Sequence, residues 1–310
     1  MIVVFLSVFA VLFLGLPQTA HAWGTGAHVD FGLTILGNLA LLTPAIRALL
    51  KKHPQDYLYG NLAADTVIGK NLAPAEEHVH NWDVAIKLFD HANDDSNKAF
   101  VYGYLSHLSA DTVAHNYFVA KKRVDSFRSI TSGHAYWELR YDSFLPAHVW
   151  ETSTKIAKVR GDAFQSHDEL LEFGLKPTIL TVASNRAVYA SFLTVSSRVE
   201  RWRELMRSHA ERSATPFDAR ERDLFRTLAV GAITDFLNDF RESRTYAADA
   251  TGQANLGAGW KIASLLRNNA AAIKSGEADD IARKVGAALR GGLHVERAVD
   301  LSSALARAAA

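Results

Sequence analysis

Apolar side chains recur at helical spacing along most of the chain, whereas the alternation typical of strands is scarce. The helices predicted from this spacing cover residues 30–41, 44–52, 98–119, 132–145, 177–212 and 220–241. Turn-forming residues cluster without an apolar period at 60–61 and 71–74, so loops are expected there. The pattern therefore predicts an all-α protein.

The first 22 residues differ from the rest of the chain. An apolar run from Ile2 to Leu16 is too short to span a bilayer comfortably, and Pro17 interrupts it. Ala20-His21-Ala22 then provides the small residues of a cleavage site for exported precursors. We expect residues 1–22 to be a signal peptide, and the protein to be periplasmic or secreted after cleavage following Ala22. An uncleaved anchor is the alternative.

The composition of residues 23–310 indicates two regions and restricts the kinds of ligand and partner that the protein can bind. Residues 23–250 are expected to form one helical domain, and 251–310 an Ala- and Gly-rich helical tail, either packed on the domain or mobile. The chain has no cysteine, which excludes disulfides and thiolate zinc sites. With 34 basic and 33 acidic residues, nothing favours a stable nucleic-acid partner.

The strongest chemical signal lies in the helix predicted over 98–119. His107 and Asp111 are separated by one helical turn, an angular offset of roughly 40°, and His115 by roughly 80° from His107. Three potential ligands therefore share one face. Asp111 has two oxygens and can bridge neighbouring ions, while each histidine offers one ring nitrogen.

A second pair with the same spacing follows in the helix predicted over 132–145. His134 and Glu138 are one turn apart. A single pair of this kind also fits a solvated helix surface or a satisfied core. Two pairs together with His115 favour a metal site.

Two ligands are expected on connections that fold over the helical face. Asp65 follows the loop predicted at 60–61, and His80 stands in a short segment with His78, of which only one points inward. Trp82 next to His80 indicates a buried environment, so His80 is the preferred candidate. The histidines outside these motifs lack ligand spacing and are expected at the surface or satisfied in the core: His53, His91, His148, His167, His209 and His294.

Processing after Ala22 would turn Trp23 into a ligand. An α-amino group has a pKa of about 7.7 to 8.0, so a metal displaces its proton at neutral pH, and the Trp23 carbonyl closes a chelate ring. His28 lies within reach of the same ion.

This order of motifs resembles the bacterial zinc-dependent phospholipase C family, which is related in fold to zinc-dependent single-strand nucleases. The resemblance implies a multi-helix bundle with a zinc cluster at one end and three zinc ions per chain. It assigns Asp65, His80, His107 and Asp111 to a first zinc; His115, His134 and Glu138 to a second; and Trp23, His28 and the bridging Asp111 to a third. Asp142, one turn after Glu138, could replace it or support it.

The function implied is hydrolysis of a phospholipid, or another phosphodiester, by a zinc-bound hydroxide. Zinc brings the pKa of bound water toward about 7, and Asp65 would orient the hydroxide or accept its proton. The products would be diacylglycerol and a phosphorylated head group, with peripheral contact to a membrane. One alternative is a nuclease-like zinc phosphodiesterase that stacks bases on Tyr57, Tyr59, Trp82, Tyr136 and Trp137. The other is a non-catalytic helical zinc-binding protein.

Overall fold

The computed structural model describes residues 24–66, 78–129, 133–159, 161–175 and 217–291, with single positions at 181, 182, 184, 186, 187, 190, 208 and 215. Across these ranges every regular element is a helix and no strand occurs. The all-α prediction is therefore confirmed. No helix in the described ranges is long and apolar enough to cross a membrane.

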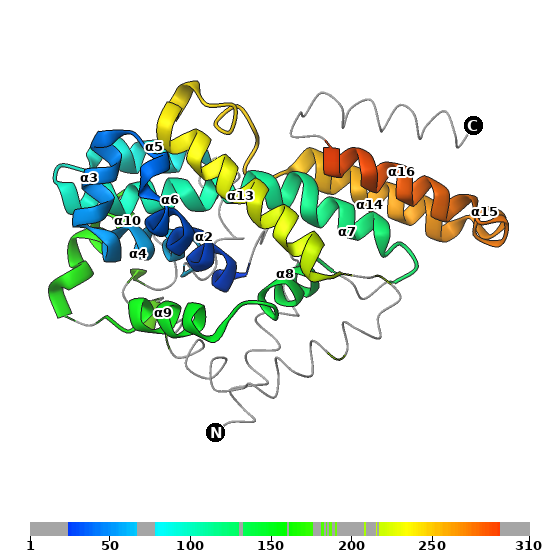
Figure 1. Ribbon diagram of the computed structural model, residues 1–310, viewed down its shortest axis with the longest axis horizontal. Coiled ribbons are helices and arrows are strands. Elements are labelled where there is room, and N and C mark those ends of the chain that lie inside the picture. The colour runs from blue at the N-terminus through cyan, green and yellow to red at the C-terminus, as the bar shows by residue number, and fades with distance from the viewer. Residues whose placement is uncertain are drawn as a thin grey trace.

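The helices form a body and an extension, as Figure 1 shows. The α-helices are α2 (Thr25–Gly37), α3 (Pro44–Lys52), α4 (Pro54–Thr66), α5 (Trp82–His91), α6 (Asp95–Val113), α7 (Ala120–Asp125), α8 (His134–Asp142), α9 (Ala147–Ala157), α10 (Gln165–Gly174), α13 (Ala219–Asp239), α14 (Gln253–Asn268), α15 (Ala270–Ser275) and α16 (Glu277–Gly291). Shorter segments are η1 (Leu39–Leu41), the π-helical η4 (Ala114–Val119), η5 (Gly161–Phe164) and η6 (Phe240–Glu242). The body gathers α2 to α6 with α9 and α10, and the extension holds α14 to α16 beside α7.

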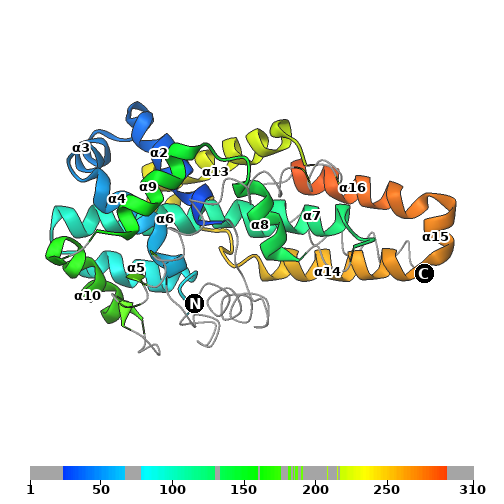
Figure 2. The same cartoon turned by 90° about the horizontal axis from the view of Figure 1, so that it is seen from below.

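Helix α6 is the central element, and it continues through η4 into α7 (Figure 2). Its start is capped by Asp94, whose side chain accepts a hydrogen bond from the Asn97 N–H at 2.8 Å. From Gly103 to Val113 every residue is buried, because α4 and α13 pack against different sides of the helix. A helix that is buried all round places any polar side chain in a dry interior.

The loop predicted at residues 60–61 is wrong, because both residues lie inside α4. A Cβ on Gly60 would lie 1.9 Å from the carbonyl oxygen of Phe100, and one on Gly103 would lie 2.0 Å from that of Tyr57. The glycines therefore allow α4 and α6 to touch backbone to backbone rather than forming a turn. As a consequence Asp65 lies in the last turn of α4 and not on a connection.

Other boundaries differ from the predictions for local reasons. Helix α2 begins at Thr25, five residues before the predicted start, which brings His28 into a helix. The predicted helix at 98–119 begins earlier and changes to a π-helix at Ala114. The loop predicted at 71–74 and most of the helix predicted at 177–212 lie outside the described residues.

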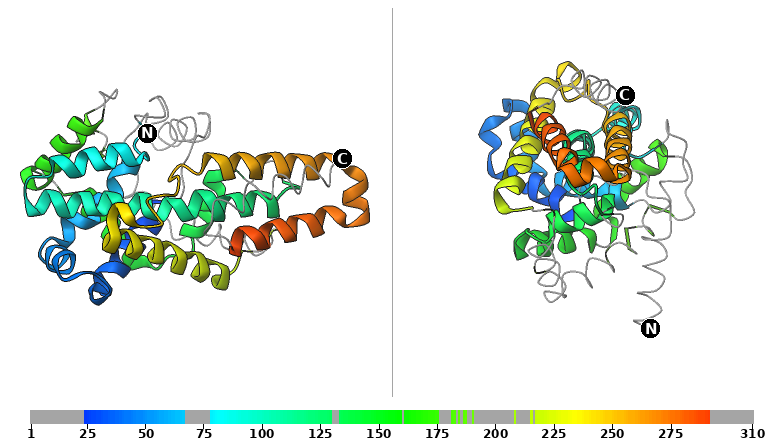
Figure 3. Two further views of the ribbon diagram at one scale, coloured as in Figure 1. Left: turned by 90° about the horizontal axis from the view of Figure 1, so that it is seen from above. Right: turned by 90° about the vertical axis from the view of Figure 1, so that its right-hand side faces the viewer.

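The described C-terminal helices pack on α7 through a second hydrophobic core, and Figure 3 shows α14 and α16 beside the end of the central helix. This core is built mostly from small and branched side chains: Ala120, Val124, Phe127, Ile262, Ala263, Leu266, Ala272, Ala278, Ala282, Val285 and Leu289. Residues 253–291 therefore form helices packed on the end of the central helix.

Candidate metal centre

Asp111 lies at the middle of a group of imidazoles that come from three elements. Its Oδ2 is 3.3 Å from Nε2 of His107, one turn earlier on α6, and 3.3 Å from Nε2 of His80. Its other oxygen, Oδ1, is 3.3 Å from Nε2 of His28 on α2. The His28 and His107 rings stack with centroids 3.6 Å apart. One carboxylate therefore has ring nitrogens close to both of its oxygens.

Asp65 adds a second carboxylate to the same group. Its Oδ1 is 3.7 Å from Nε2 of His80 and 4.0 Å from Nε2 of His107, while those two nitrogens are 3.1 Å apart. The ligand atoms of Asp65, His80 and His107 all lie within 4.8 Å of one another, as do those of His28, His107 and Asp111. The geometry therefore contains two overlapping groups that could each hold an ion.

The second helical pair lies next to this group. His134 Nε2 is 3.1 Å from Oε1 of Glu138 on α8. The ring of His115, on η4, lies between the two groups, with its centroid 5.2 Å from that of His134 and 6.4 Å from that of His80. All eight described candidates from His28 to Glu138 thus converge on one region.

The donor atoms of Asp111 and His28 fit a cation. Asp111 is 0 % and His28 is 1 % exposed, and neither oxygen of Asp111 nor either ring nitrogen of His28 has a hydrogen-bond partner among the described residues. A buried carboxylate without donors is costly unless a cation compensates it. Imidazole nitrogens and carboxylate oxygens without any thiolate are a donor set that zinc accepts.

Burial and neighbouring charges shift the pKa values of the groups in this cluster. Burial alone would raise the pKa of Asp111, but the adjacent His107 and His28 outweigh it and hold that pKa well below its usual range. Burial lowers the pKa of His28, and the nearby His107 lowers it further. Burial also lowers the pKa of His107, but the nearby Asp111 and Asp65 outweigh it and raise that pKa. These directions favour the ionised form of Asp111 and the neutral form of His28, and a cation bound at His107 would displace its proton.

Neighbouring groups hold the imidazoles in place. His107 donates from Nδ1 to the carbonyl of Asn61 at 2.9 Å, which directs Nε2 toward Asp111. His78 accepts the backbone N–H of His80 on its Nδ1 at 3.2 Å, so its ring supports the loop. The geometry places His80, rather than His78, among the candidate ligands. Tyr104 donates to the carbonyl of Val79 between them.

Comparison with known families agrees with this geometry. Residues 27–177 match the model of the family described as zinc dependent phospholipase C. Residues 27–177 belong to the zinc-dependent phospholipase C family. The matched stretch spans every described candidate ligand, and its members are phosphoric diester hydrolases, so the chain is an enzyme of this type. The comparisons with curated proteins and with solved structures found no match.

Asp142 of this phospholipase C domain has a role that its spacing did not indicate. It accepts the backbone N–H groups of Gly26 and Ala27 at 3.2 and 3.1 Å, at the first turn of α2. Burial raises the pKa of Asp142 to about 8, although the two donors act in the opposite direction. Its Oδ2 would lie 2.1 Å from a Cβ on Gly24, so a larger residue at that position would displace this carboxylate. Asp142 therefore anchors the helix that carries His28.

The aromatic residues considered as base-stacking platforms are mostly inside the phospholipase C domain. Tyr57 and Tyr59 are 0 % exposed and Trp137 is 1 % exposed. Trp82 stacks on Phe236 and donates from Nε1 to the Ala248 carbonyl. Tyr57, Tyr59 and Trp137 therefore belong to the core, and Trp82 is partly buried against it.

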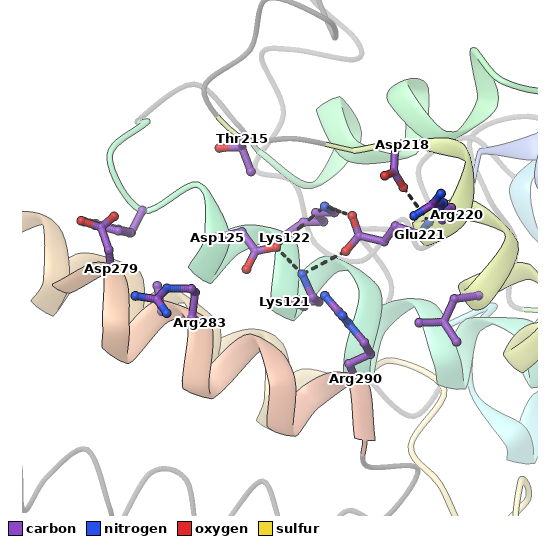
Figure 4. Close-up of a pocket in the computed structure, with 13 residues that line it drawn as sticks. Lys121, Lys122, Asp125, Thr215, Asp218, Arg220, Glu221, Asp279, Arg283 and Arg290 are labelled. Atoms are coloured by element: carbon purple, nitrogen blue, oxygen red, sulfur yellow. Dashed lines mark hydrogen bonds and ion pairs between the residues drawn. The ribbon is translucent and has the colours of Figure 1, made fainter. Parts of the chain in front are cut away.

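A cavity of about 640 Å³ lies away from the candidate ligands, between α7, α13 and α16 (Figure 4). Part of its charged lining is paired: Lys121 is 2.9 Å from Glu221, and Lys122 also contacts Glu221. Burial lowers the pKa of Lys122 despite the opposing charge of Glu221. Ion pairs therefore link α7 and α13 across this cavity, and none of the candidate metal ligands lines it.

Trp23 and the leader proposed at residues 1–22 lie outside the described residues. The first described residue, Gly24, lies against Asp142 at the start of α2. The chain therefore enters the described structure close to the helix that carries His28.

Proposed function

We propose that the domain hydrolyses the head-group phosphodiester bond of phospholipids, releasing diacylglycerol and a phosphorylated alcohol. The observation that carries this proposal is the buried Asp111 carboxylate, which has His28 at one oxygen and His80 and His107 at the other, without a hydrogen-bond donor among the described residues. A carboxylate in this position is suited to bridging two cations. Adjacent cations can together bind the anionic oxygens of a phosphodiester.

Three zinc ions per chain are proposed, with the ligands divided by position. The first ion would be held by Asp65, His80, His107 and Asp111; the second by His115, His134 and Glu138; and the third by Trp23, His28 and Asp111. When bound, zinc supplies Lewis-acid chemistry that acidifies water and offsets charge on phosphoryl oxygens.

Asp65 is proposed as the residue that orients the attacking water. Its side chain is 10 % exposed, whereas those of His80 and His107 are fully buried, so it faces the side from which water and substrate arrive. An ionised carboxylate there accepts a hydrogen bond from the water and can receive its proton. His107 and Asp111 are held in the dry interior, where they exclude competing water and keep their positions.

Export and leader removal after Ala22 are part of the proposal, because they create the Trp23 amine. Two purified forms test it, one beginning at Trp23 and one with a single alanine before Trp23. The first is expected to bind three zinc ions and the second two, as measured by atomic emission after gel filtration. Equal zinc content in both forms would rule out the amine as a ligand.

The substrate is tested with purified zinc-loaded protein on phosphatidylcholine vesicles and on a chromogenic phosphorylcholine ester. Hydrolysis of both is expected, and Asp65→Asn should slow it by more than about 100-fold. Asp90→Asn, at an exposed position on α5, is the matched control and should leave the rate unchanged. Cleavage of single-stranded DNA without lipid hydrolysis would favour the nuclease, and zinc binding without any hydrolysis a structural metal protein.

A further inference from the structure

His115 lies on a segment whose backbone departs from the α-helix. Helix α6 ends at Val113, and residues 114–119 form the π-helical η4 before α7 begins. A π turn contains one residue more than an α turn, so it displaces the side chains that follow it around the helix axis. Such turns are rare and are frequently found at functional sites. The orientation of the His115 ring therefore depends on the contacts made by this widened turn.

A turn from a distant part of the chain packs on η4 at this point. The carbonyl of Ala250 accepts a hydrogen bond from Nδ1 of His115 at 2.5 Å. Asn116 donates from its side chain to the carbonyl of Asp249 at 2.7 Å, and Asn255 donates to the carbonyl of Asn116 at 2.9 Å. The turn therefore contacts both the ring and the backbone of the π-helix.

Gly252 makes this approach sterically feasible. It adopts the left-handed conformation with φ of 58°, and a Cβ there would lie 2.3 Å from Cβ of His115 and 2.8 Å from its carbonyl carbon. Any side chain would both strain the backbone and push the turn away from His115.

The turn is also braced internally. The carboxylate of Asp249 accepts the N–H groups of Thr251 and Gln253 at 2.9 and 3.1 Å, and α14 begins at Gln253. The indole of Trp82, two residues after His80, donates to the carbonyl of Ala248 at 2.8 Å. A braced turn gives the Ala250 carbonyl a defined direction.

We propose that the turn formed by residues 249–252 positions His115 for the second metal site, although it lies more than 70 residues beyond the matched stretch, which ends at residue 177. A proton on Nδ1 donated to Ala250 leaves the lone pair on Nε2, and the carbonyl orients the ring beside His134. The inference rests on the proposed function, since it assumes that His115, His134 and Glu138 bind zinc.

The test is the zinc content and affinity of full-length mature protein with altered turns. Gly252→Ala should lose about one zinc ion per chain, or bind it roughly 10- to 100-fold more weakly, the loss typical of groups that orient a metal ligand. Gly257→Ala is the matched control, because it lies in the next turn of α14 with open space around it. Zinc per chain is measured by atomic emission, affinity by chelator competition, and folding by circular dichroism.

Asn255→Ala decides the question if Gly252→Ala does not fold, since it removes only the bond to Asn116. It should weaken the same ion, whereas Asn268→Ala, exposed at the end of α14, should not. If folded Gly252→Ala or Asn255→Ala binds zinc as its control does, the inference is wrong. If the unaltered protein binds no zinc, the proposed function fails instead.

Discussion

Two buried clusters of this protein both contain histidine and aspartate, but they differ in whether hydrogen bonds within the protein satisfy the polar atoms. In the first, His28, His107 and Asp111 lie together, and the donor atoms of His28 and Asp111 have no hydrogen-bond partner among the described residues. In the second, near the start of α6, His167 is 0 % exposed and both of its nitrogens are engaged, Nδ1 with Asn97 at 2.7 Å and Nε2 with Asp56 at 2.9 Å.

The difference shows that histidine and aspartate in a protein core do not by themselves indicate a metal. At His167 the protein supplies the partners, so the network is complete without an ion and joins α4, α6 and α10. At Asp111 the surrounding groups are imidazoles that approach without hydrogen-bond geometry, and a bound cation would lower the cost of the buried charge further.

The largest effect is expected from Asp111→Asn. It preserves the shape of the side chain but removes the charge shared by two proposed ions. We therefore expect loss of bound zinc and a fall in activity of more than about 100-fold, which exceeds the loss typical of groups that only orient a metal ligand. Asp56→Asn makes the same change in the second cluster, and this variant should bind as much zinc as the unaltered protein. Unchanged zinc content and turnover in Asp111→Asn would refute the proposed centre.

Removing zinc should destabilise the protein by the next largest amount. A ligand that binds only the folded state contributes about 4 kcal/mol when its free concentration is about 1,000 times its Kd. We expect a chelator to lower the melting temperature of the unaltered protein and to have much less effect on Asp111→Asn. A melting temperature that is insensitive to chelation would contradict the assignment of the orphaned donors to an ion.

His167→Ala should affect stability and leave zinc unchanged. It deprives the partly buried Asp56 and Asn97 of their partner, which we expect to cost about 1–3 kcal/mol in the free energy of unfolding. His91→Ala, at an exposed position, should cost less than about 0.5 kcal/mol. Denaturant unfolding measures both, and zinc loss in His167→Ala would show that the two clusters are coupled.

The smallest effect is a pH dependence in the second cluster. Burial would raise the pKa of Asp56, but the hydrogen bond and charge of His167, with hydrogen bonds from Ser96 and His53, together outweigh burial and lower that pKa from 3.8. A depressed carboxyl pKa stabilises the folded state above pH 3.8, and this contribution is lost as the pH falls through the lower folded value, about 1.4 kcal/mol for each pKa unit. The stability gap between the unaltered protein and Asp56→Asn should therefore narrow below about pH 4. A gap that stays constant down to pH 2 would argue against the shift.

Local sequence patterns were sufficient to predict two of the residue pairs in the candidate metal centre. The one-turn spacing of His107 and Asp111, and of His134 and Glu138, follows from the 3.6-residue period, which a sequence expresses directly. The same period predicted an all-α protein, and the structure confirms it for the residues that it describes.

The spacing of residues along the chain did not predict the structure at positions where distant segments come into contact. The contact between Gly60 and Gly103 turned a predicted loop into part of α4 and placed Asp65 at the end of a helix. Asp142 was considered as a substitute for Glu138, but it caps α2 through two backbone N–H groups, a role that spacing does not encode.

The sequence by itself therefore determined the helical class and the candidate ligand pairs on α6 and α8, because both depend on residues a few positions apart. Only the tertiary structure decided which histidine of the His78 and His80 pair faces Asp111, and which distant turn holds His115. Those choices depend on side chains and carbonyls brought together from well-separated parts of the chain, where helical periodicity carries no information.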